Sequence, residues 1–264
     1  MRIALTIAGS DSGGGAGIQA DLKTFQRFGV FGTSAITAIT AQNTIGVTRW
    51  EALSVDIVRA QIDAVATDLP PESFKTGMLA NAAIASAVSA AIRDLALLNY
   101  VLDPVMVATS GDLLLEQEAV RVIRDELVPQ AALVTPNLHE AAILVGESIE
   151  DEDGMARAAE KIAGEMGARA VLLKGGHLTS DDRIVDILYD GAVRAFRGRR
   201  IDTTSTHGTG CTLSAAISAQ LAKGESLHAA VRISIEYVHS AIATAPGLGS
   251  GHGPLNHGVG IVEP

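Results

Sequence analysis

Continuous apolar segments alternate with segments of helical periodicity along nearly the whole chain. Short apolar runs bounded by Gly, Pro or polar residues predict buried strands, and apolar side chains three or four positions apart predict helices. The expected strands are Ile3–Ala8, Ser34–Ala41, Phe74–Leu79, Tyr100–Val105, Ala132–Thr135 and Ala170–Leu173, followed by an antiparallel hairpin of Ile184–Tyr189 and Val193–Arg199. The expected helices are Ala16–Phe28, Asp56–Leu69, Ala82–Leu95, Glu116–Leu127, Glu140–Leu144, Gly154–Met166, Cys211–Ala222 and Leu227–Ala243.

This alternation predicts an α/β fold with a central, mostly parallel β-sheet flanked by helices on both faces. The sequence shows no internal repeat and no low-complexity linker, so we expect residues 1–264 to form a single domain. Ligands of such sheets bind outside the carboxyl ends of the strands. Polar residues at those ends are therefore the first candidates for a functional site.

Composition narrows the class of protein. Hydrophobic residues make up 47% of the chain, enough to bury a large core. The net charge of −10, without a basic block, argues against a nucleic-acid surface. No apolar run approaches the about 18 residues of a membrane span. The single cysteine, Cys211, cannot form an intrachain disulfide and fits a reducing compartment, so we expect a soluble cytoplasmic protein.

The stretch Thr206-His207-Gly208-Thr209-Gly210-Cys211 joins a glycine-rich turn to an expected helix. Backbone N–H groups at a helix N-terminus lack intrahelical partners, and the helix dipole is positive there. Glycine lets the backbone approach a ligand closely. The turn thus predicts an anion site suited to phosphate, although an ordinary loop-to-helix turn has the same pattern.

The first expected strand opens into a second glycine-rich loop, Ser10–Gly17. Its glycine spacing does not match the dinucleotide fingerprint, because Ile18 stands where the third glycine belongs, and the absence of a Gly-Lys dipeptide excludes a P-loop. The loop suits close contact with a ligand, and equally a flexible turn. Asp21, in the helix that follows, either favours the helix N-terminus by its charge or faces a substrate.

Polar residues also follow the other expected strands. The amide of Gln42 offers a donor and an acceptor that match an amino-substituted heteroaromatic ring, or else it belongs to a polar turn. Asp103 suits Mg²⁺ or orders a turn. Asn137 and Glu140 have the spacing of a capping box and also of two metal- or phosphate-binding side chains. Lys174 ends an apolar strand, where it can neutralise phosphate or lie in solvent.

Taken together, and in this order, these segments resemble the bacterial hydroxymethylpyrimidine/phosphomethylpyrimidine kinases of thiamine biosynthesis, in the ribokinase-like superfamily. The resemblance spans essentially the whole chain. The matching segments are Ile7–Asp21, Ala41–Thr44, Leu102–Met106, Thr135–Ala141, Leu173–His177, His207–Thr212 and Gly253–His257.

The resemblance implies a ribokinase-like fold and transfer of phosphate from ATP, with Mg²⁺, to 4-amino-5-hydroxymethyl-2-methylpyrimidine and then to its monophosphate. It implies that Gln42 binds the aminopyrimidine, and that Asp21 and the first glycine-rich loop, with Gly9 at its start, shape the pocket. The residues implied for ATP and Mg²⁺ are Lys174, Asn137 and Glu140. We also expect Thr209 to bind the nucleotide and Asp103 to bind Mg²⁺.

Sugar kinases of the superfamily carry Asp where Cys211 stands, whereas the pyrimidine kinases resemble this chain in having Cys. A thiol at a helix N-terminus can have a lowered pKa, so we expect Cys211 to accept the hydroxyl proton in the first step. Phosphoryl transfer depends mainly on positioning and charge stabilisation. We therefore expect the larger share from Lys174, Mg²⁺ and the backbone of Gly208, Gly210 and Cys211.

Two alternatives remain open at this point. A pyridoxal or pyridoxamine kinase of the same superfamily acts on a similar ring with a hydroxymethyl arm, although Gln42 and Cys211 favour the pyrimidine. A nucleotide- or pyrimidine-binding regulator without catalysis is expected to lack Lys174, the Asn137 and Glu140 pair, or the glycine turn. The resemblance also suggests a homodimer.

Overall fold

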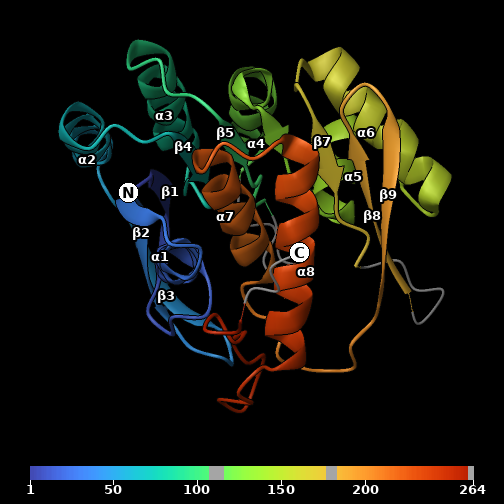
Figure 1. Cartoon of the computed structure of the whole chain (residues 1–264). Coiled ribbons are helices and arrows are strands. Elements are labelled where there is room, and N and C mark those ends of the chain that lie inside the picture. Colours follow the sequence, from blue (N-terminus) through green and yellow to red (C-terminus); the bar gives the residue numbers. More distant parts are fainter. Residues whose placement is uncertain (107–115, 177–182, 261–264) are drawn as a thin grey trace.

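The computed structural model describes residues 1–106, 116–176 and 183–260 and forms one nine-stranded sheet in the order β3-β2-β1-β4-β5-β6-β7-β8-β9 (Figure 1). Strands β2, β1, β4, β5, β6 and β7 run parallel, while β3, β8 and β9 are antiparallel to their neighbours. The strand bounds are β1 Ile3–Asp11, β2 Phe31–Gln42, β3 Val47–Ala52, β4 Ser73–Thr76, β5 Tyr100–Leu102, β6 Leu133–Val134, β7 Val171–Leu173, β8 Arg183–Tyr189 and β9 Val193–Arg199.

Helices cover both faces of this sheet. Helices α2 to α6 share one buried core with it, and α1, α7 and α8 share a second core on the opposite face. The helix bounds are α1 Gly17–Arg27, α2 Val55–Asp68, α3 Ala82–Asp94, α4 Gln117–Val122, α5 Leu138–Val145, α6 Glu152–Met166, α7 Thr209–Ala222 and α8 Leu227–Ala243. The expected α/β architecture is thus confirmed.

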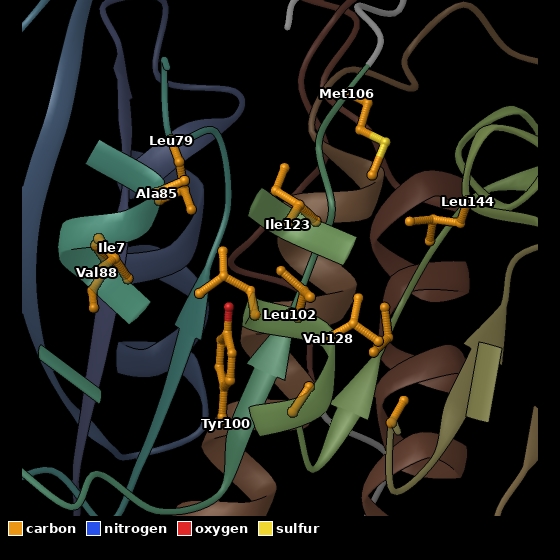
Figure 2. Packing of buried hydrophobic residues seen from close by; sticks show 14 of the residues in the cluster. Ile7, Leu79, Ala85, Val88, Tyr100, Leu102, Met106, Ile123, Val128 and Leu144 are labelled. Carbon is orange, nitrogen blue, oxygen red and sulfur yellow. The ribbon is translucent and has the colours of Figure 1, made fainter. Parts of the chain in front are cut away.

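The larger core lies between the sheet and α2 to α6. It is built mainly from Ala, Val, Ile and Leu, with Phe74 stacked on Tyr100 at a ring-centroid distance of 4.6 Å. Figure 2 shows Leu102 of β5 in the same part of this core as Ile123 and Val128. Most strand residues facing this core are apolar, and a buried polar exception, Thr37 in β2, donates from Oγ1 to the Met78 oxygen at 2.6 Å.

Helix α7 is buried on almost all sides. Small residues let it pack directly against β1, β4 and β5, and it lies beside α8 (Figure 1). One of its buried hydroxyl groups has a partner in the sheet: the Ser218 and Ser73 oxygens lie 2.9 Å apart. A helix held in this way fixes the position of its own N-terminus, which is the predicted anion turn.

The structure differs from the predicted elements in two places. Strand β3 was not predicted, because Val47–Glu51 is exposed on both faces and carries no pattern of a buried strand. The expected helix Glu116–Leu127 is divided, with α4 followed by a π-helical turn, Ile123–Leu127, and a 3-10 turn, Val128–Gln130. No helix within the described ranges is both long enough and apolar enough to cross a membrane.

Candidate active site

The candidate residues gather because the parallel strands end at one edge of the sheet. Asp11 ends β1 and Gln42 ends β2, while Asp103 follows β5 directly. Asn137, after β6, forms a bridge with Lys174, after β7. Five positions that are far apart in the sequence therefore lie along a single edge.

The glycine turn meets this edge at the N-terminus of α7. Gly208 has the left-handed φ of 82°, and a Cβ atom there would lie 1.9 Å from the carbonyl oxygen of Gly15 in the first glycine-rich loop. Only glycine fits such a contact. The first α-helical bond, from Thr212 N–H to the Gly208 oxygen, is 2.8 Å long, so the amides of Gly210 and Cys211 precede the hydrogen-bonded ladder and are suited to bind an anion.

Lys174 and Asp103 face this turn from the sheet. Lys174 Nζ lies 3.1 Å from Asp103 Oδ1, and it would lie 3.2 Å from a Cβ atom at Gly210. Although burial favours the neutral amine, the Asp103 and Glu140 carboxylates raise the pKa of Lys174, so its ammonium group stays charged. Sequence reasoning missed two hydroxyl groups near Asp103, Thr135 Oγ1 and Ser214 Oγ, each at 3.4 Å.

Asn137 and Glu140 form the predicted capping box of α5. Glu140 N–H donates to Asn137 Oδ1 at 2.9 Å, and Asn137 N–H donates to Glu140 Oε2 at 2.8 Å. Burial raises the pKa of Glu140 to about 7, opposed by the Lys174 ammonium and reinforced by the Asp103 carboxylate. Glu140 therefore acts as a helix cap and also shares the electrostatic environment of Lys174 and Asp103.

The side chains present fit a magnesium ion only in part. Within the part of the chain that the structure describes, no group of three His, Cys, Asp or Glu side chains is arranged to hold a metal. Two carboxylates, Asp103 and Glu140, face the same site. Mg²⁺ in phosphoryl-transfer sites commonly binds one or two protein carboxylates together with phosphate oxygens and water. This donor set suits a metal that arrives with a nucleotide.

The expectation of a lowered pKa for Cys211 is wrong. Burial raises the pKa of the thiol to about 11, although the Lys75 ammonium and a hydrogen bond from the Gly17 amide act in the opposite direction. The loss of solvent around the sulfur thus raises the thiol pKa by more than the helix N-terminus lowers it. The thiol is neutral near pH 7, so it is a weak general base.

Asp21, which is expected to help shape the substrate pocket, lies in the interior of the structure. Its side chain is fully buried, accepts a hydrogen bond from Thr6 Oγ1 at 2.6 Å, and pairs with Lys75 Nζ at 3.1 Å from both carboxylate oxygens. Burial alone would lower the pKa of Lys75, but the Asp21 carboxylate outweighs it and raises that pKa. Asp21 therefore acts within the interior, beneath Cys211, and not at a solvent-facing pocket wall.

Gln42 joins a polar network that sequence reasoning missed. Its amide nitrogen lies 3.3 Å from His207 Nε2, which in turn lies 2.8 Å from Asp11 Oδ2. Asp11 is buried and also accepts hydrogen bonds from the amides of Gly13, Gly15 and Ala16 in the first glycine-rich loop. The network links the end of β2 to both glycine-rich segments.

The remaining predicted residues lie at the same edge. Thr209 begins α7, and its hydroxyl donates to the Thr206 oxygen at 2.7 Å. Gly9 is buried in β1, where a Cβ atom would lie 2.6 Å from the methyl carbon of Met78. A separate surface hollow of about 560 Å³ contains none of the candidate residues. Its lining consists of Arg124, Asp125, Pro129, Leu144, Val145, Lys161, Glu165 and Met166.

Comparison with known proteins shows the family to which the chain belongs. The sequence profile described as Phosphomethylpyrimidine kinase matches residues 11–256. A hydroxymethylpyrimidine/phosphomethylpyrimidine kinase of Rhizobium meliloti (strain 1021) is 54% identical over 97% of this chain and 96% of the relative. The Bacillus subtilis (strain 168) protein of the same name is 49% identical over 96% of this chain and 94% of its own.

Solved structures share the fold at substantial identity. A phosphomethylpyrimidine kinase from Clostridium difficile 630 has a TM-score of 0.83 at 42% identity and covers 92% of this chain and 100% of its own. A Bacillus subtilis pyridoxal kinase in complex with ADP has a TM-score of 0.90 at 39% identity and covers 97% of each chain. The arrangement is ribokinase-like, as expected. With a profile match over most of its length and relatives near half identity, the chain belongs to the phosphomethylpyrimidine kinase family.

Proposed function

We propose that this chain is a kinase that transfers the terminal phosphate of ATP to 4-amino-5-hydroxymethyl-2-methylpyrimidine and then to its monophosphate, in thiamine biosynthesis. Family membership supports the reaction and the small pyrimidine substrate. The observation that carries the chemistry is the approach of Lys174 and Asp103 to Gly210, at the N-terminus of a buried helix.

In the first proposed step, the substrate hydroxyl oxygen attacks the terminal phosphorus of ATP, the bond to the bridging oxygen breaks, ADP leaves, and the hydroxyl proton passes to water or a phosphate oxygen. In the second step, an oxygen of the monophosphate is the attacking atom. The amides of Gly210 and Cys211 bind the migrating phosphoryl group, and Gly208 allows the turn that aims them. Lys174 neutralises phosphate charge, with Thr209 and Asn137 at the nucleotide side. Mg²⁺, held by Asp103 and Glu140, would supply further charge neutralisation when bound.

Cys211 has a minor part as a proton acceptor in this proposal. Because burial raises the pKa of its thiol to about 11, few molecules carry a thiolate at neutral pH. We expect Cys211→Ser to lower the first phosphorylation by less than about tenfold. The second phosphorylation, on an acceptor that is already anionic, should change still less.

At the substrate end, we propose that Gln42 binds the ring and that Gly9 allows the ring to approach β1. Asp21 supports the site indirectly, through its buried ion pair with Lys75. We further propose a single domain over residues 1–264, a homodimer and a cytoplasmic location. The exposed apolar side chains of Ile39, Val47 and Trp50 on the β2 and β3 strands support an interface between two copies, and the lone cysteine is compatible with a reducing compartment.

A coupled assay of ADP release tests the reaction. With ATP and Mg²⁺, we expect turnover on hydroxymethylpyrimidine and on its monophosphate, and Lys174→Met should lower kcat on both by about a hundredfold or more. Binding of pyrimidine without ADP release would instead identify a non-catalytic regulator. Retention of full activity by Lys174→Met would contradict the proposed site.

Pyridoxal kinase activity is a second candidate. The TM-score of 0.90 with a Bacillus subtilis pyridoxal kinase favours a pocket of related shape. Comparing kcat/KM on pyridoxal and on hydroxymethylpyrimidine in the same preparation separates a primary activity from a side activity.

A further inference from the structure

The hydrogen bonds around Gln42 determine which end of its amide faces which neighbour. Thr40 Oγ1 lies 2.8 Å from the Ser10 carbonyl oxygen and 3.1 Å from the amide oxygen assigned to Gln42. A threonine hydroxyl has one hydrogen, and a carbonyl oxygen only accepts. The hydrogen therefore belongs to the Ser10 bond, and Thr40 Oγ1 has only its lone pairs to offer Gln42. This contact requires the amide nitrogen, not the oxygen, on the Thr40 side.

The contact of the Gln42 amide with His207 favours the same orientation of the amide. His207 Nε2 lies 2.8 Å from Asp11 Oδ2, and that oxygen also accepts from the amides of Gly15 and Ala16. Burial alone would raise the pKa of Asp11, but the hydrogen bond from His207 and those from backbone amides lower it, so Asp11 is a carboxylate. The proton between them then lies on His207 Nε2. Because the single hydrogen on Nε2 points to Asp11, this nitrogen has no lone pair for Gln42, and an amide N–H 3.3 Å away would face it donor to donor. The amide oxygen is therefore the compatible atom on the His207 side.

From these two independent contacts we propose that His207, held by Asp11, is a specificity-positioning residue that fixes the Gln42 amide with Oε1 toward His207 and Nε2 toward Thr40. This orientation reverses the one described above, in which Nε2 lies beside His207 and Oε1 beside Thr40. In this orientation Oε1 keeps at least one lone pair, and Nε2, after its contact with Thr40, keeps one N–H. The half-buried side chain can offer these to a ring.

The fixed amide dictates how an aminopyrimidine lies, an inference that rests on the proposed function. Oε1 accepts from the exocyclic amino group and Nε2 donates to the adjacent ring nitrogen. The amino group then lies on the His207 side, and the hydroxymethyl carbon, the next substituent around the ring, continues toward Gly208. The reversed amide would instead match a 4-oxo ring, which presents a carbonyl acceptor beside a ring N–H. His207 thereby couples ring recognition to the phosphate turn.

The direct test measures the protonated nitrogen. In ¹⁵N-labelled wild-type protein without substrate, the His207 ring signals, assigned by their loss in His207→Gln, should show Nε2 bearing a proton. An unprotonated Nε2 would overturn the proposal. This measurement uses the folded wild-type chain and does not depend on activity.

The kinetic test compares kcat/KM on the 4-amino substrate with that on its 4-oxo analogue. His207→Ala should lower the preference for the amino ring by about tenfold or more, mainly through KM, and Thr40→Val should shift it in the same direction. Damage to the phosphate turn affects both substrates and cancels in the ratio. The control His252→Ala, at an exposed histidine, should leave the ratio unchanged.

Gln42→Ala separates failure of this inference from failure of the proposed function. If Gln42→Ala abolishes the preference while His207→Ala and Thr40→Val retain it, Gln42 reads the ring but His207 does not position it, and the inference is overturned. If Gln42→Ala keeps the full preference, ring reading by Gln42 itself is wrong, and the inference falls with it. ADP release on the amino substrate checks the kinase activity in either case.

Discussion

A fully buried ion pair lies beneath the site, and its energetic role follows from its surroundings. Lys75 and Asp21 have no exposed side-chain surface and lie 3.1 Å apart. Burying two charges is costly, and their attraction with good hydrogen bonds roughly offsets that cost. Removal of one partner leaves the other charged and unpaired in the interior, which is far more costly than removal of both.

We expect Lys75→Met to lower the free energy of unfolding by about 3–5 kcal/mol, because Asp21 loses its counter-charge. Urea unfolding measures this loss. The double variant Lys75→Met/Asp21→Asn should recover much of it, and the exposed control Lys223→Met should change little. Equal stability of Lys75→Met and the control would show that Asp21 does not need its partner.

His257 gives the fold a predictable sensitivity to acid. Its ring nitrogen lies 3.1 Å from Thr212 Oγ1 in α7, and burial, with the nearby Lys23 charge, lowers its pKa to about 4. The unfolded chain binds a proton below about pH 6.5, whereas the folded chain does not until about pH 4. Stability from this group is therefore present above pH 6.5 and is lost as the pH falls.

Between about pH 7 and about pH 5, wild-type protein should lose about 2 kcal/mol more unfolding free energy than His257→Gln. Urea titrations at the two pH values measure the difference. His239→Gln, at an exposed histidine, is the control and should follow the wild type. An identical pH response of His257→Gln and wild type would contradict the burial argument.

At the level of single residues, the sequence predicted positions that follow from the end of a strand. Asp103, Lys174 and Gln42 could be found in that way. Asp11 and His207 could not, because they are 196 positions apart and no sequence pattern pairs them. The interior position of Asp21 could not be predicted, because its partner Lys75 belongs to a different element. The Cys211 pKa was misjudged because burial of the thiol is a property of the folded chain.

At the scale of elements, the site depends on one contact between two loops. Gly208 packs against the Gly15 carbonyl, and α7, which begins directly after Gly208, packs against the sheet. The sequence predicted the glycine turn, the helix and most strands from periodicity. It could not reveal β3, which lacks a buried face, or the π-helical turn after α4, whose residues continue an ordinary helical pattern.

Gly208→Ala should lower kcat/KM by about a hundredfold or more, because a Cβ atom 1.9 Å from the Gly15 oxygen forces the turn away from its position. Steady-state kinetics measure the loss. Gly224→Ala is the matched control: its φ is 90°, with no atom within 4 Å of the added carbon. That variant should lose about 1 kcal/mol of stability and keep its activity, whereas equal activity losses would contradict a role for the contact.

At the scale of the whole molecule, a single sheet joins all the described strands. We therefore expect the chain to unfold as one unit. Trp50, the only tryptophan, reports on β3 at one edge of the sheet, while far-UV circular dichroism reports on all the helices. The two urea transitions should coincide, and a separate early fluorescence change would show that this edge is an independent unit.

The order of elements also has a consequence for synthesis of the protein. Gly15 lies close to Gly208, and Phe25 of α1 shares a buried core with apolar residues of α7 and α8. On the ribosome, α1 therefore emerges long before the helices that shield it. A nascent chain therefore exposes this apolar face through most of translation, and we expect chaperones to bind it until α7 and α8 have been synthesised.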